Sequence, residues 1–155
     1  MFEGHAEILH SMRKADRLTW PVLLCFFTGP LPAYAAAMPR DPSPQLGALF
    51  EGGFNAAIER AMRENPALHD GAVMLGRPAS KEVYRIAGWS HRLLPPPVDT
   101  STPNMGSAFN SCLAMSAVDG VDFLYLLGRN ATFRFEKGQA ATIEECRTAK
   151  RRVGG

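Results

Sequence analysis

The chain has 155 residues, 46% of them hydrophobic and 21% charged, which is enough apolar material for one folded domain. Its 17 Lys and Arg residues against 15 Asp and Glu residues leave a formal net charge of +2, without the strongly basic composition expected of a nucleic-acid partner. No His, Cys or carboxylate residues stand at the spacing of a metal site, so we expect neither a metal nor another cofactor.

The first 35 residues have the pattern of a secretory signal peptide. A basic start at Met12 to Arg17 precedes the apolar run Leu18 to Phe27, and Ala33-Tyr34-Ala35 provides the small residues of a peptidase site. The apolar run is about half of the ~20 residues that a spanning helix needs. We therefore predict cleavage after Ala35 or Ala37, and a mature protein that is periplasmic or secreted, in a bacterium, and meets the membrane only during export.

Two alternatives to this interpretation stay open. Glu3 and Glu7 fit poorly in a basic flank, which favours Met12 as the true start. An uncleaved membrane anchor is the other alternative, although Pro21 and the following Gly and Pro residues argue against a durable span.

The predicted export determines which state we expect for the cysteines. Cys25 would leave with the signal, so Cys112 and Cys146 would remain as a pair in an oxidising compartment, where a disulfide is expected. Inert buried thiols and a catalytic cysteine are the competing interpretations.

The first half of the mature chain contains a leader, a helix and a hairpin. Residues 36–44 hold three prolines and predict an extended leader, and apolar residues at three- and four-residue steps predict a helix over 44–64. Residues 72–75 and 82–87 predict two strands around a Gly-Arg-Pro turn. The Pro-rich stretch 94–104 then predicts a long surface loop.

The second half repeats this order. We expect a short helix over 107–117, strands at 121–127 and 131–136, and a final helix over 142–152 that opens with a Thr142/Glu145 capping box. Short matches between the halves are compatible with a duplication, but unrelated hairpins also share turn and strand residues.

Together these elements predict a small two-layer α+β domain over residues 45–155. Its antiparallel sheet would have about four strands, formed by the two hairpins, and two to three helices would cover it after removal of the signal peptide.

The run around Trp89 and His91 is the richest in reactive side chains. Ser90 or Ser111 with His91 and Asp99 would supply a nucleophile, a base and an orienting carboxylate. However, adjacent residues on a strand point to opposite faces, so Ser90 and His91 would pair only if the strand ended there. An ordinary loop histidine and a core tryptophan are the alternatives.

Arg85 and Arg134 occupy matching positions in the two hairpins. If the strands align, both guanidinium groups could recognise a carboxylate or phosphate group of a ligand. A solvated sheet face is the alternative.

No catalytic motif stands out, so we predict an exported binding or inhibitor-type module that contacts an envelope protein, an extracellular protein or a small ligand. The alternatives are a small hydrolase centred on His91 and a structural component of an envelope assembly that pairs through a sheet edge.

Overall fold

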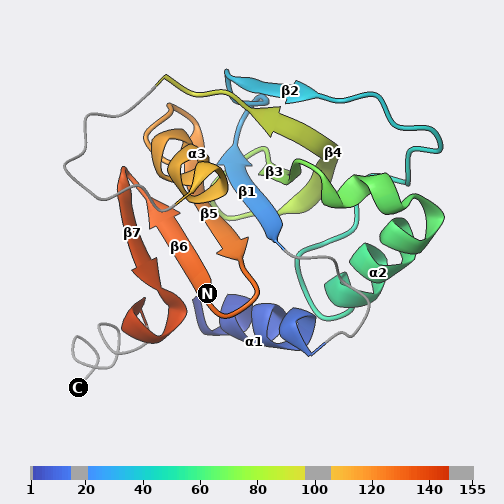
Figure 1. Cartoon of the computed structure of the whole chain (residues 1–155), viewed down its shortest axis with the longest axis horizontal. Coiled ribbons are helices and arrows are strands. Elements are labelled where there is room, and N and C mark those ends of the chain that lie inside the picture. The colour runs from blue at the N-terminus through green and yellow to red at the C-terminus, as the bar shows by residue number, and fades with distance from the viewer. Residues whose placement is uncertain (1, 15–20, 97–105, 147–155) are drawn as a thin grey trace.

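A computed structural model describes residues 2–14, 21–96 and 106–146 as one α+β domain (Figure 1). Its seven strands form a single mixed sheet in the order β2-β4-β3-β1-β5-β6-β7. The strands are β1 (Val22–Thr28), β2 (Ala35–Ala37), β3 (Ala72–Arg77), β4 (Arg85–Leu93), β5 (Val121–Leu127), β6 (Thr132–Glu136) and β7 (Gln139–Thr142). The helices are α1 (Phe2–Arg13), α2 (Phe54–Glu64), the 3-10 helix η1 (Pro66–His69) and α3 (Ser107–Met115).

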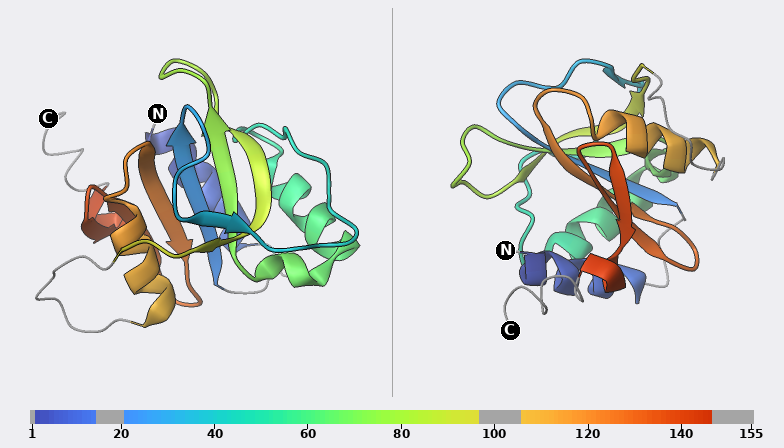
Figure 2. Two further views of the ribbon diagram at one scale, coloured as in Figure 1. Left: turned by 90° about the horizontal axis from the view of Figure 1, so that it is seen from above. Right: turned by 90° about the vertical axis from the view of Figure 1, so that its left-hand side faces the viewer.

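The sheet has a helical layer on each face. Figure 2 shows α1 and α2 on one side of the sheet and α3 on the other. The cluster beneath α1 and α2 contains the larger aromatic side chains, and the cluster beneath α3 contains Cys25, Cys112 and mostly aliphatic residues. The fold is therefore a three-layer arrangement, where the sequence predicted two layers.

Strand β1 lies at the centre of the sheet, between β3 and β5. It pairs parallel with β3 and antiparallel with β5. Leu24 and Phe26 belong to the α1/α2 cluster, whereas Cys25 and Phe27 belong to the α3 cluster. A strand buried on both faces is apolar at consecutive positions, which is also the pattern of the core of a signal peptide.

The expected export signal is instead part of the folded domain. In α1, Ala6, Leu9 and Met12 are buried against the sheet. Arg13, expected in the cationic flank of the signal, donates hydrogen bonds to the Gly128 carbonyl (2.7 Å) and to the Thr132 hydroxyl (3.0 Å). Residues 1–35 thus supply a core helix and the central strand, and a domain bounded at residue 45 would lack both.

The apolar run also does not form an anchor helix here. Among the helices that the structure describes, none has both the length and the apolar character needed to cross a membrane.

The two predicted hairpins are present, but they do not pair with each other. They are β3-β4 and β5-β6, and β1 separates them. The prediction of a four-stranded antiparallel sheet was therefore wrong: it lacked β1, whose pairing with β3 is parallel, and the edge strands β2 and β7.

The predicted helices differ from the observed ones mainly at their ends. The helix expected over 44–64 begins only at Phe54, because Gly53 before it has a left-handed backbone (φ 93°). The capping box is confirmed: the Thr142 and Glu145 side chains each accept a hydrogen bond from the other residue's backbone N–H at 3.2 Å. The rest of that final helix, after residue 146, and most of the loop at 94–104 lie outside the described residues.

Candidate functional site

The structure places Trp89 and His91 in the core. Both lie on β4 and are buried, and Trp89 donates its indole N–H to the Gln45 carbonyl at 3.3 Å. The His91 Nδ1 atom lies 3.1 Å from the Trp89 carbonyl oxygen, and its ring packs so closely on Gly88 that a Cβ there would lie 2.3 Å from it. Trp89 and His91 are therefore packed side chains of the interior, with structural roles.

The predicted pairing of Ser90 with His91 is not formed. Ser90 lies at an irregularity of the β3/β4 ladder and has a left-handed backbone (φ 52°). Its hydroxyl accepts a hydrogen bond from Arg40 Nε at 3.1 Å and lies 3.5 Å from the Leu68 carbonyl. Ser90, one of the two candidate nucleophiles of the alternative hydrolase, therefore has structural partners. The other candidate, Ser111, lies on α3, and Asp99 lies outside the described residues.

Arg85 and Arg134 are not brought together. They lie on β4 and β6, which are separated by three strands, so their backbones are roughly 19 Å apart at the usual strand spacing. Arg85 is exposed, whereas the Arg134 guanidinium stacks over Phe123 at 4.0 Å and forms an ion pair with Glu136 at 3.7 Å. One shared anion site for the two arginines is excluded.

The predicted disulfide is absent. Cys25, Cys112 and Cys146 are all free thiols. Cys112 is a fully buried residue of α3, in the same cluster as Cys25, and Cys146 lies beyond β7. Burial raises the pKa of the Cys25 and Cys112 thiols, which disfavours their reactive thiolate forms.

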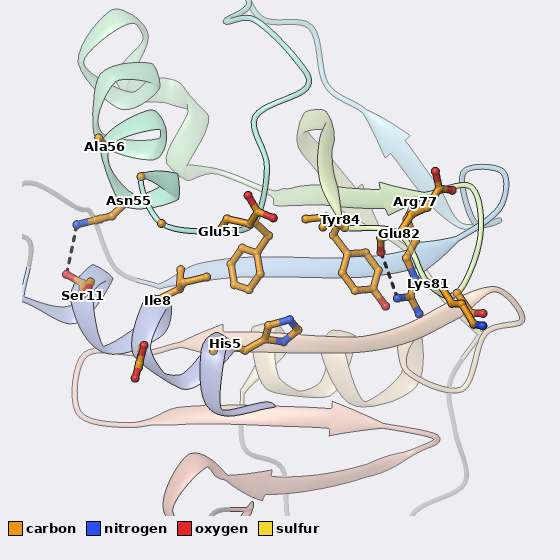
Figure 3. Close-up of a pocket in the computed structure, with 17 residues that line it drawn as sticks. His5, Ile8, Ser11, Glu51, Asn55, Ala56, Arg77, Lys81, Glu82 and Tyr84 are labelled. Carbon is orange, nitrogen blue, oxygen red and sulfur yellow. Dashed lines mark hydrogen bonds between the residues drawn. The ribbon is translucent and has the colours of Figure 1, made fainter. Parts of the chain in front are cut away.

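A cavity of about 930 Å³ opens at the α1/α2 face of the sheet (Figure 3). Its walls come from α1, from the segment between Phe50 and Ala56, and from the turn that joins β3 to β4. Two further cavities have volumes of about 440 and 420 Å³. The large cavity has the size of a small-molecule site, and its lining is mostly apolar.

Aromatic side chains form one side of this cavity. The His5 ring projects from α1 into this region (Figure 3), and its centroid lies 4.9 Å from that of Phe50 and 6.4 Å from that of Tyr84. Phe26, beneath them, contacts Phe50 edge-on at 4.9 Å and stacks on Phe123 at 4.6 Å. We call His5, Phe50 and Tyr84 the aromatic floor. Phe50 and Tyr84 are buried, with 4% and 3% of their surface exposed, so the half-buried His5 ring is the most accessible part of this floor.

A polar network lies at one end of the aromatic floor. Asp122 Oδ2 accepts hydrogen bonds from the hydroxyls of Thr28 (2.5 Å) and Tyr84 (2.7 Å). Arg77 donates from Nε to the Thr28 hydroxyl at 2.9 Å, and its guanidinium lies 4.3 Å from the centre of the Tyr84 ring. Burial and the bond to Asp122 raise the pKa of Tyr84, so its hydroxyl stays protonated and donates.

His5 is neutral at physiological pH. Burial, reinforced by the charges of Arg134 and Arg77, lowers its pKa to about 4. Its Nδ1 lies 3.2 Å from the Tyr125 hydroxyl, which the Arg134 guanidinium also contacts. The aromatic floor therefore carries no charge of its own.

Side chains of both charges line the cavity, and Glu82 lies next to Lys81 on the β3/β4 turn. Glu51 extends from the segment before α2, and Arg77 and Lys81 come from the β3/β4 turn (Figure 3). In the part of the chain that the structure describes, no group of three His, Cys, Asp or Glu residues could hold a metal ion.

Sequence reasoning missed His5, Arg77, Tyr84 and Asp122 as site residues. It set His5 aside with the expected signal, and it assigned Arg77 to a turn. To find these residues from the sequence, residues 22–28 would have to be identified as a buried strand. Only that strand brings α1 and the end of β3 side by side.

Comparisons with known proteins find likeness in fold alone. No family model matches the sequence, and no curated protein matches it. A hypothetical membrane-spanning protein from Bacillus cereus is similar in structure, with a TM-score of 0.58 and 14% identity over 90% of this chain and 61% of the other. DacA from Staphylococcus aureus, solved as a double mutant, has a TM-score of 0.55 and 13% identity over 91% of this chain and 84% of that one.

Proposed function

We propose that this protein is a non-catalytic binding module and that the cavity beneath α1 holds a small, flat, apolar molecule. The observation that carries this proposal is the aromatic floor inside a mostly apolar cavity of about 930 Å³. Ligand sites in proteins are typically concave and apolar, with a few polar groups that set orientation. Arg77, Lys81 and Glu51 are such groups here.

A neutral fluorescent probe tests this proposal. N-phenyl-1-naphthylamine is flat and apolar, and we expect one molecule to bind per chain with a dissociation constant on the order of 10 µM. Fluorescence titration of the full chain measures both the stoichiometry and the affinity.

Two matched variants locate the probe. Ala56 and Ala67 are both exposed helical residues, but only Ala56 lines the cavity. Ala56→Trp should fill the site and weaken probe binding at least tenfold, whereas Ala67→Trp should leave it within twofold. Equal affinity of both variants, or no saturable binding at all, would contradict the proposal.

The likeness to DacA favours one enzymatic alternative, because DacA is a diadenylate cyclase. At 13% identity this likeness extends to the fold, and a nucleotide activity of the present chain is a separate hypothesis. Incubation with ATP and Mg²⁺ or Mn²⁺, followed by chromatography of the nucleotides, tests it directly. Conversion of ATP would replace the non-catalytic proposal with an enzymatic one.

A further inference from the structure

Arg77 stands at the end of the cavity with donor capacity to spare. It is the last residue of β3, and its side chain is 12% exposed. Its Nε is bound to Thr28, and one terminal nitrogen lies 3.4 Å from the Glu82 carbonyl oxygen. The other terminal nitrogen lies 3.9 Å from Asp122 Oδ2, which is longer than a hydrogen bond.

The donor inventory points to an acceptor that comes from outside the chain. A guanidinium has five N–H donors, and two of them are used in the hydrogen bonds to Thr28 and Glu82. The remaining donors on the two terminal nitrogens have the geometry to bind a ligand with two adjacent oxygens.

The surroundings of Arg77 hold its guanidinium in one orientation. The Tyr84 ring lies against its plane, and Thr28 fixes its Nε edge. Asp122 lies 3.9 Å from the Arg77 guanidinium, and Lys81 and Glu82 both line the same side of the cavity. Tyr84 thus joins this end to the aromatic floor, and Glu51 lies away from it (Figure 3).

We propose that the ligand of this cavity is an aromatic organic anion, whose ring lies on the aromatic floor and whose carboxylate or phosphate group binds Arg77, with Lys81 nearby. This proposal rests on the binding function proposed above and adds the chemical class of the ligand. Arg77 is the residue that determines specificity, because a planar guanidinium matches a carboxylate or phosphate edge.

A pair of probes with one ring system isolates the anionic group. 8-anilinonaphthalene-1-sulfonate is N-phenyl-1-naphthylamine with an added sulfonate, so the ratio of their dissociation constants measures the contribution of the charge. We expect the anionic probe to bind the native chain at least tenfold more tightly. Arg77→Gln should reduce that ratio to about one, whereas Arg85→Gln, at an exposed position on β4, should leave it unchanged.

The ratio separates recognition from structural damage. If Arg77 had only a structural role, Arg77→Gln would weaken the binding of both probes equally and keep the native ratio of dissociation constants. That result would overturn the proposal. Arg77→Lys keeps the charge but not the planar fork, so an intermediate ratio is expected. Failure of the neutral probe to bind the native chain would instead contradict the proposed function itself.

Competition on the native chain keeps the test independent of whether the variants fold. 1-Naphthoate and the neutral 1-naphthamide have the same rings and nearly the same shape. We expect 1-naphthoate to displace N-phenyl-1-naphthylamine at a concentration at least tenfold lower, and 1-naphthyl phosphate, assayed beside it, shows which acid the site prefers. Equal potency of the amide and both acids would overturn the proposal.

Discussion

The two faces of the sheet are formed by the same strands but differ in what covers them. Beneath α3, Cys25, Leu124 and Phe135 are fully buried in a cluster of apolar side chains and thiols. On the α1/α2 face the neighbouring positions Phe26 and Tyr125 pack among aromatic rings, and two rings that contact Phe26, those of Phe50 and Tyr84, line the large cavity. One face therefore supplies packing, and the other combines packing with a site.

The largest expected effect tests whether both faces depend on β1. A chain that begins at Ala36 lacks α1 and β1, the strand between β3 and β5. Strands β3 and β5 then lose the backbone hydrogen bonds and the apolar contacts that they make with β1. We expect this truncated chain to be insoluble or unfolded by circular dichroism, and Leu24→Asp in the full chain to have a similar effect.

A folded, cooperatively melting fragment from Ala36 onward would contradict this expectation. Export of the protein stays a prediction of the sequence, and the N-terminus of material recovered from the cell envelope would test it. Recovery of a folded product cleaved after Ala35 or Ala37 would mean that the sheet can form without β1.

The difference between the sequence interpretation and the structure at α1 and β1 has a clear physical origin. Local order along the chain was predictable for both hairpins and for α3, because each depends on turn residues and short-range periodicity. The run Leu23 to Phe27 has no periodicity at all, since both of its faces are buried, and an apolar run of this length is equally typical of a signal peptide.

The site was less predictable than the fold because its parts are distant in sequence. His5, Phe50, Arg77 and Asp122 come from four separate elements, and only the pairing of β1 with β3 and β5 brings them together. Two of the residues chosen from sequence, Trp89 and His91, lie two positions apart in the chain, but both are buried on β4.

Single core substitutions should distinguish the two faces. Leu124→Ala, beneath α3, should lower the free energy of unfolding by about 2 to 5 kcal/mol and leave binding of N-phenyl-1-naphthylamine within twofold. Phe50→Ala, in the aromatic floor, should lower the free energy of unfolding by a similar amount and also weaken binding of the probe tenfold or more. Urea unfolding and fluorescence titration measure the two effects, and an equal loss of binding in both variants would remove the distinction.

A smaller effect is expected within the polar network. Tyr84→Phe removes the hydroxyl that donates to Asp122 and should lower the free energy of unfolding by about 1 to 2 kcal/mol. A hydrogen bond to a charged group contributes more to stability than one between neutral groups. The matched control is Tyr34→Phe, since the Tyr34 side chain is exposed and removal of its hydroxyl should cost little. Equal stability of the two variants would show that the Tyr84 bond to Asp122 contributes little.

The smallest expected effect concerns pH and the charge state of the aromatic floor. His5 has a pKa near 4 in the folded chain, against about 6.5 when unfolded, so the unfolded state binds the extra proton between these values. The contribution of His5 is therefore complete above about pH 6.5 and is lost as the pH falls toward 4.

We expect the melting temperature of the native chain to fall by a few degrees between pH 7 and pH 5, and His5→Gln to flatten this dependence. His10 is the matched control, because it lies exposed on the same helix, and His10→Gln should keep the native slope. If both variants kept that slope, protonation of His5 would not oppose folding, and α1 would not hold a neutral imidazole against the Phe50 and Tyr84 rings. A flattened slope in His5→Gln alone would mean that the face with the cavity, and not the α3 face, makes the fold sensitive to acid in this range.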